Sequence, residues 1–293
     1  MKYSFGNDMK VPMKIFNLKN ILIFLVVAFF AYSALETINP TNKIAVLEIY
    51  GVIKNPKKYL ESIEKIKEDK SIKALIVRID SPGGTVGSSQ EIYNSLMNLN
   101  NFMPVVSSIV DIGASGGYLV ACGTSYIFAN SGSITGSIGV ISQYYDASEL
   151  IKFLKFKVEV IKSGQLKDIG SPLKKLDDNE RKLLNELIKD VHRQFELVVK
   201  ERRKLTDTEI EKISDGRIFS GNQALALKLI DAIGGLESAK AYVEKNIDLY
   251  DLKLEYFPRK KRKLIDRIIP LLNGESLGTN FAKKLYYLYS PNF

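Results

Sequence analysis

Short apolar runs alternate with amphipathic stretches along most of this chain. The segments Lys43–Tyr50 and Lys73–Asp80 are rich in Val, Ile and Leu, which is typical of buried β-strands. Between them, apolar residues recur at helical spacing among Lys and Glu, which predicts a helix around Tyr59–Ile66. This alternation predicts an α/β domain with a largely parallel sheet. Further strands are expected at Pro104–Val110, Ser125–Ala129, Ile138–Ile141 and Val158–Ile161.

A longer amphipathic pattern extends from Asp177 to Lys204 and predicts one long helix. The only histidine of the chain, His192, falls within it and is expected to be a boundary residue on the helix surface. The apolar residues of the helix share one side, and they are Leu183, Leu184, Leu187, Val191, Phe195 and Val198.

The stretch Ile21–Leu35 is apolar, uncharged and without a polar stripe. With the apolar residues before it, the stretch approaches the ~20 residues of a transmembrane helix. Lys10, Lys14 and Lys19 precede it, which places that flank in the cytoplasm and the body of the protein outside. A cleaved signal peptide is the alternative, because the apolar length also fits one. No clean cleavage site follows the run, so we expect a retained single-pass anchor.

The net charge of +9 is concentrated at the two ends of the chain. Residues 1–20 carry +3, residues 253–293 carry +6, and the part between them is neutral. Basic ends beside a neutral body favour contact with an anionic membrane surface over a nucleic-acid partner. No zinc-ligand spacing occurs, and neither a metal nor another cofactor is expected. The single cysteine, Cys122, follows an apolar run and is expected to be a buried structural thiol.

Two glycine-containing turns follow predicted strands and are candidates for chemistry. Ser81–Thr85 reads Ser-Pro-Gly-Gly-Thr, and its glycines leave backbone N–H groups uncovered by side chains. In Asp111–Tyr118, Ser115 stands between glycines and fits the G-x-S-x-G pattern of a nucleophile elbow. Loops at the carboxyl ends of neighbouring parallel strands meet at one edge of a sheet. The N–H groups of Gly84 and Gly116 are therefore candidates for an oxyanion hole facing Ser115.

A serine nucleophile needs a base, yet residues 79–151 contain no Lys or Arg. His192 is a poor candidate because it lies in a charged helix. A lysine with its ordinary pKa of ~10.4 is a weak base near neutral pH unless burial lowers that pKa. Most lysines of the chain lie among other charges, but Lys167 lies in a loop bounded by Gly164 and Pro172. Lys167 is thus the candidate general base, with an ordinary surface lysine as the alternative.

Five segments together resemble the signal peptide peptidase A family of membrane-bound serine proteases. The segments are Asp80–Gly84, Gly113–Tyr118, Gly136–Val140, Ser163–Lys167 and Asp215–Gly221, and the resemblance covers about residues 45 to 257. It implies Ser115 as nucleophile, Lys167 as general base and Ser137 as the hydroxyl that orients the lysine. It also implies Gly84 and Gly116 as the oxyanion donors. The Asp215–Arg217 part is expected to form a turn and an ion pair.

The resemblance further implies a ClpP/crotonase-like fold of repeated ββα units behind one N-terminal transmembrane helix. Residues 1–38 are the expected cytoplasmic stub and anchor, residues 39–258 the Ser–Lys protease domain, and residues 259–293 a basic and apolar tail. The expected enzyme resides in the cell membrane and hydrolyses remnant signal peptides or other membrane-associated peptides. A ring-like homo-oligomer is also implied, in which neighbouring subunits can complete the dyad.

Three alternatives stay open at this point. A related protease encoded beside stomatin-like proteins shares the serine motif but places the lysine at a shorter spacing. A crotonase-type acyl-CoA enzyme would need a carboxylate, for which Asp111 and Asp146 are the nearest candidates. A non-catalytic assembly protein of this fold would not need Ser115, Ser137 and Lys167.

Overall fold

The computed structural model describes residues 21–28, 42–259 and 286–288. The chain divides into two units, residues 1–41 and residues 42–293, which are considered separately. In the first unit, residues 21–28 are helical and their side chains are exposed. Of the helices in the described ranges, none combines the length and the apolar character that a membrane crossing requires. Most of the predicted anchor lies outside the described residues, and its retention stays a prediction.

Within the described part of the second unit, eight strands form one sheet in the order β7-β6-β4-β2-β1-β9, with β5 beside β4 and β8 beside β5. Its strand pairs are parallel, apart from the antiparallel pair β6–β7. The predicted α/β domain with a largely parallel sheet is therefore confirmed. The strands are β1 (Lys43–Tyr50), β2 (Ile72–Ser81), β4 (Val105–Ala114), β5 (Tyr126–Ala129), β6 (Ile134–Gly136), β7 (Ile218–Ser220), β8 (Ala232–Ile233) and β9 (Lys253–Phe257).

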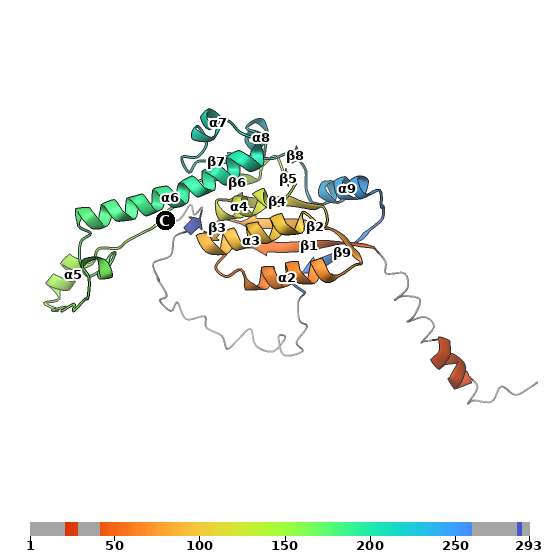
Figure 1. Ribbon diagram of the computed structural model, residues 1–293, viewed down its shortest axis with the longest axis horizontal. Coiled ribbons are helices and arrows are strands. Elements are labelled where there is room, and N and C mark those ends of the chain that lie inside the picture. Colours follow the sequence, from red (N-terminus) through yellow and green to blue (C-terminus); the bar gives the residue numbers. More distant parts are fainter. Residues whose placement is uncertain (1–20, 29–41, 260–285, 289–293) are drawn as a thin grey trace, which may run out of the picture. The chain divides into compact units, whose positions relative to one another are not determined.

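Helices cover both faces of this sheet (Figure 1). Alternate residues of β2 show the two faces: Leu75 and Val77 pack in one core, and Ala74 and Ile76 pack in the other. The first core includes residues of the helices that connect the parallel strands, and the second includes residues of α9. These helices are α2 (Lys57–Glu68), α3 (Val86–Leu99), α4 (Gly116–Cys122) and, on the opposite face, α9 (Leu236–Ile247).

The predicted long helix is α6 (Asp178–Arg203), which ends in caps at Asp177 and Lys204. Its C-terminal half packs against α4, and its N-terminal half extends away from the sheet (Figure 1). Residues 146–177, here called the arm, lie at the N-terminal end of α6 and contain α5 (Ser148–Phe153) and a 3₁₀ helix (Gln165–Asp168). The predicted apolar stripe is accordingly buried only in the C-terminal half of the helix.

Shorter elements complete the described chain. A further strand, β3 (Gly83–Thr85), follows β2, and it pairs antiparallel with β10 (Tyr286–Leu288) from the C-terminal tail. The other described part of the tail is Arg259, so most of the predicted basic and apolar tail lies outside the described residues. The two remaining helices are α7 (Asp207–Glu211) and α8 (Gly221–Ala226).

Two predicted strands are wrong. Ile138–Ile141 forms no strand of the sheet, because the backbone turns at Ser137 with φ 51° and the Ile138 carbonyl accepts from the Gly216 N–H. The sheet is extended just before this turn, by β6. Val158–Ile161 is exposed in the arm and has no strand partner in the described chain. An apolar run there reflects an uncovered surface rather than a buried strand.

Candidate active site

Ser115 occupies the sharp turn between the end of β4 and the start of α4. Its backbone has φ 52° and ψ −120°, a conformation that costs a non-glycine residue about 1–3 kcal/mol. The Ser115 N–H donates to Gly136 O over 2.8 Å, and the Leu119 N–H donates to Ser115 O over 2.9 Å. Ser115 is 1% exposed. This is the strained strand-to-helix geometry of a nucleophile elbow, as the motif predicts.

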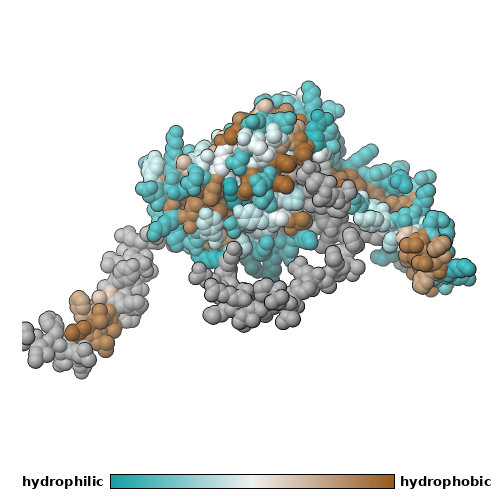
Figure 2. All heavy atoms as spheres, turned by 180° about the vertical axis from the view of Figure 1, so that it is seen from behind, coloured by the Kyte–Doolittle hydropathy of each residue, from teal (hydrophilic) through white to brown (hydrophobic). Residues whose placement is uncertain are grey.

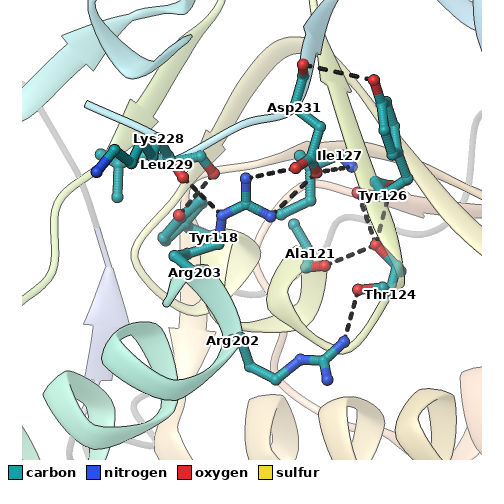
Figure 3. Close-up of polar contacts among 11 residues, drawn as sticks. Tyr118, Ala121, Thr124, Tyr126, Ile127, Arg202, Arg203, Lys228, Leu229 and Asp231 are labelled. Carbon is teal, nitrogen blue, oxygen red and sulfur yellow. Dashed lines mark hydrogen bonds and ion pairs between the residues drawn. The ribbon is translucent and has the colours of Figure 1, made fainter. Parts of the chain in front are cut away.

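Hydrogen bonds hold the helix behind Ser115 at two places, and Figure 3 shows the bonds of Tyr118 to Leu229 and of Arg202 to Thr124, just after the helix. The Tyr118 hydroxyl donates to Leu229 O over 2.7 Å. Burial raises the pKa of Tyr118 well above its ordinary value, so the hydroxyl remains a donor near neutral pH. At the other end of α4, the Arg202 guanidinium of α6 donates to Cys122 O over 2.9 Å. These bonds tie α4 to its surroundings and help to maintain the strained turn in front of it.

The loops after β2 and β4 meet at one edge of the sheet. Ser81, at the end of β2, pairs in register with Gly113 of β4. The start of α4 lies so close to this loop that a Cβ atom on Gly117 would come within 2.7 Å of Ser81 O. The glycine turn of residues 81–85 therefore lies beside the serine turn, as the parallel-sheet argument predicts.

The position of Gly84 permits only a glycine. Gly83 O accepts from the Ile53 N–H, and the Thr85 N–H donates to Ile53 O, each over 2.8 Å. A Cβ atom on Gly84 would come within 2.0 Å of Ile53 O. The C=O and N–H of one trans peptide group point in opposite directions, so the N–H of Gly84, which shares its peptide group with Gly83 O, points away from Ile53. That N–H lies on the edge of β3 where β10 pairs.

Ser137 reaches the same region from β6, which pairs with the last residues of β4. Its φ is 51°, and its N–H donates to Arg217 O over 2.8 Å. Arg217 belongs to a turn in which its side chain pairs with Asp215 over 2.6 Å, and this confirms the predicted turn and ion pair. The Asp215–Arg217 turn thus supports the backbone at Ser137. Ser137 is buried beside the Ser115 turn.

Lys167 lies apart from the other predicted site residues. It belongs to the 3₁₀ helix of the arm, where it is exposed. Figure 1 shows the arm at the N-terminal end of α6, whereas α4 lies beside the C-terminal half of that helix. A single chain therefore brings together the turns of Ser115, Gly84 and Ser137, with Gly116 directly after the serine. It does not bring Lys167 to them.

Two other potentially reactive side chains, those of Cys122 and His192, lie in the packed core and on the helix α6. Cys122 is fully buried, and burial raises the pKa of its thiol to about 11, so little thiolate exists near neutral pH. The prediction of a buried structural thiol is confirmed. His192 lies on α6 with its Nε2 3.2 Å from Glu196 Oε1. Within the described ranges, no group of three or more His, Cys, Asp or Glu residues is arranged to hold a metal ion.

Sequence reasoning misses two features of this region. The first is β10, in which Tyr287 lies opposite Gly84. Its only signal in the sequence is a short apolar and aromatic run near the end of the chain. The second is a set of ion pairs around Asp168, the residue next to Lys167. Spacing alone does not reveal that set, because its members lie several residues apart in an irregular segment.

Comparison with known proteins identifies relatives over most of the chain. The profile of peptidase family S49 matches residues 98–250. "Putative protease slr0021" of Synechocystis is 44% identical over 201 residues, which cover 68% of this chain and 73% of that protein. "Putative protease MJ0651" of Methanocaldococcus jannaschii is 30% identical, with coverage of 82% and 76%. "Putative signal peptide peptidase SppA" of Enterococcus faecium is 34% identical, with coverage of 67% and 58%.

The α/β fold and the buried serine elbow beside backbone N–H groups define a serine hydrolase type of site. The chain belongs to peptidase family S49 and is a serine peptidase of the signal peptide peptidase A family. The matched region contains Ser115, Ser137 and Lys167, and Gly84 precedes it. This membership favours a protease over the crotonase-type alternative.

Proposed function

We propose that this peptidase is a membrane-anchored endopeptidase that hydrolyses remnant signal peptides or other membrane-associated peptides through a Ser–Lys dyad. The observation that carries the proposal is the strained, buried Ser115 turn beside Gly84 and Ser137. The helix-covered parallel sheet supports a ClpP/crotonase-like arrangement of ββα units. In the proposed organisation, residues 1–38 anchor residues 39–258, the protease domain, and residues 259–293 are the tail.

The proposed reaction proceeds through an acyl-enzyme. Neutral Lys167 Nζ takes the proton of Ser115 Oγ, and Oγ attacks the carbonyl carbon of the scissile peptide bond. The N–H groups of Gly84 and Gly116 stabilise the negative oxygen of the tetrahedral intermediate. The lysine ammonium then returns its proton to the leaving amine, and the C–N bond breaks. Water, deprotonated by the same lysine, hydrolyses the Ser115 ester and releases the second product.

In the proposed assembly, Lys167 reaches Ser115 of a neighbouring subunit in a ring-like homo-oligomer. A lysine acts as a base near neutral pH where its surroundings exclude water, yet a single chain leaves Lys167 exposed. Apolar side chains of the arm are uncovered as well, with Phe153 82% and Ile161 94% exposed. Figure 2 shows apolar surface gathered at this end of the protease unit. Packing of the arm against a second copy would bury the apolar surface and complete the site.

Membrane attachment and topology are proposed from the N-terminal segment. Residues 21–28 form a helix of exposed apolar side chains, and they belong to the longer uncharged stretch Ile21–Leu35. The lysines before this stretch support a cytoplasmic N-terminus and an extracytoplasmic protease domain. Such a location fits peptides left in the membrane after signal-peptide cleavage.

The edge of β3 that faces away from Ile53, where β10 pairs, is the proposed binding site for the substrate backbone. An extended peptide can add to a strand edge through main-chain hydrogen bonds. β10 pairs there antiparallel, with Tyr287 opposite Gly84. A substrate in the same place would have its backbone beside the proposed oxyanion donor and close to Ser115. The tail segment and the substrate would therefore compete for one edge.

Deletion of residues 286–293 is expected to lower KM for peptide substrates by about two- to tenfold, since the edge of β3 is then free in every molecule. We expect kcat to stay unchanged, because the reacting groups are not altered. Steady-state kinetics of the otherwise full-length protein measure both values. Deletion of residues 289–293 alone is the control, because it leaves β10 in place. An unchanged KM after the longer deletion would argue against competition at this edge.

A fluorophosphonate probe, which reacts covalently with activated serines, tests the proposed nucleophile and base together. We expect one probe molecule per chain, attached at Ser115, when the full-length protein is labelled and its peptides are mapped by mass spectrometry. Lys167→Ala is expected to suppress the labelling, because the hydroxyl then has no base. Attachment of the probe to another serine would refute the assignment of Ser115.

A further inference from the structure

A chain of ion pairs joins the turn that carries Lys167 to the start of α6. Asp168, the next residue, accepts from Lys162 Nζ over 2.7 Å and lies 3.2 Å from Lys174 Nζ. Lys174 Nζ also donates to Glu180 Oε1 over 2.6 Å. Side chains of alternating charge therefore connect Asp168, next to Lys167 in the arm, to Glu180 at the start of α6.

Glu180 is the buried end of this chain, because its side chain is only 1% exposed. Its other oxygen accepts from the Asp177 N–H over 3.2 Å, and the Asp177 side chain accepts from the Glu180 N–H over 2.8 Å. This reciprocal pair caps the N-terminus of α6. A buried carboxylate that loses its cation is strongly destabilising, so Glu180 holds Lys174 firmly in place.

Lys162 binds both ends of the 3₁₀ helix. Its Nζ donates to Gln165 O over 2.8 Å at the start and to the Asp168 carboxylate at the end. The hydrogen bond from Lys162, together with that from Lys174, holds the pKa of Asp168 at about 2. Because this pKa is lowered on folding, the pairing is fully present above the ordinary carboxyl pKa and is lost only as the pH falls towards 2. The turn therefore keeps its ion pairs over the whole neutral range.

We propose that Lys162, Lys174 and Glu180 are positioning residues that hold, through Asp168, the turn from which Lys167 reaches the reacting serine. The inference rests on the proposed role of Lys167 as general base. The lysine side chain is a flexible four-carbon stem, so its amine is placed reproducibly only where the backbone below it is fixed. In the exposed arm the ion pairs supply that fixation. A displacement of about 1 Å in a catalytic group can reduce the rate by about 10²-fold.

Lys174→Met in the full-length protein tests this role, because Lys174 joins the two carboxylates. We expect kcat to fall about tenfold or more and KM to stay within about twofold, since the base is displaced but the peptide site is intact. The fluorophosphonate labelling rate is expected to fall by the same factor as kcat. Lys174→Arg keeps a cation that can bridge both carboxylates, and it is expected to restore most of kcat.

Lys152→Met is the matched control within the same arm. Lys152 pairs with Glu149 over 2.8 Å, but both side chains are largely exposed, at 73% and 85%, and the pair does not touch the turn of Lys167. Exposed pairs of this kind contribute little, so we expect kcat and KM within about twofold of the unmodified protein. The melting temperature and the mass of the assembly are measured for every variant. If Lys174→Met does not fold, Asp168→Asn replaces it, because that change leaves the Lys174–Glu180 pair intact.

An unchanged kcat in a folded Lys174→Met or Asp168→Asn protein overturns the proposal. A loss of kcat that Lys174→Arg does not restore, or that comes with an equal rise in KM, also overturns it. Lys167→Ala in the same assay tests the proposed dyad separately. If that variant keeps full activity, Lys167 is not the base and the proposed function fails, whatever the effect of Lys174→Met.

Discussion

Ser115→Ala and Lys167→Ala are each expected to abolish peptide hydrolysis by the full-length protein. The first change removes the oxygen proposed to attack the peptide bond, and the second removes the group proposed to take its proton. Each should lower kcat by about 10³-fold or more, because nucleophile and base act as a unit. Release of a fluorescent group from a short peptide substrate at neutral pH measures the loss. Unchanged melting temperatures would show that the loss is chemical.

His192→Ala is the control for the base. His192 pairs with Glu196 on α6, and we expect its removal to leave most of the activity. Full activity of Lys167→Ala would contradict the dyad, and loss of activity in His192→Ala would point to a histidine mechanism. These two outcomes separate the proposed Ser–Lys enzyme from a conventional serine hydrolase.

Co-expression of the two inactive variants shows whether the dyad spans two subunits. An assembly that contains both Ser115→Ala and Lys167→Ala chains has sites where an intact arm faces an intact serine turn. We expect activity to return in such mixed assemblies, purified through a different affinity tag on each chain. If Lys167 served Ser115 of its own chain, every site would lack one partner and the mixture would stay inactive.

The sequence predicts best those helices and strands in which the spacing of apolar residues matches the burial of their side chains. β1 has the predicted bounds, and α6 begins and ends within one residue of the predicted helix. The predicted strand at Val158–Ile161 is wrong because an apolar run in an exposed arm has the same composition as a buried strand. The sequence pattern reports apolar character, and only the fold shows what covers it.

Some parts of the candidate site can likewise be predicted from the sequence, and others cannot. The turns of Ser115 and Gly84 follow adjacent parallel strands, so their proximity can be predicted from strand order. The place of Lys167 cannot, because it depends on how far α6 carries the arm from the sheet. The Asp168–Lys174 ion pair cannot be predicted from the sequence either, because irregular backbone brings the two side chains together. A lysine identified by its motif can therefore lie far from the serine of its own chain.

Gly84→Ala is expected to lower kcat by about 10²–10³-fold, the effect of losing one oxyanion donor. The added Cβ would lie within 2.0 Å of Ile53 O, which is backbone and cannot turn aside. β3 must then move away from Ile53 and break the hydrogen bonds that Gly83 and Thr85 make to it. The N–H of Gly84 moves with the strand and leaves its place in the proposed oxyanion hole.

Gly87→Ala, three residues further along, separates this effect from a general intolerance of side chains near the site. Gly87 lies in α3, and a Cβ atom there would meet nothing within 4 Å. Alanine is the better helix former, so we expect this control to stabilise the protein by up to about 1 kcal/mol with kcat unchanged. Thermal unfolding and steady-state kinetics of both variants provide the comparison. A folded Gly84→Ala protein with normal kcat would remove Gly84 from the proposed oxyanion hole.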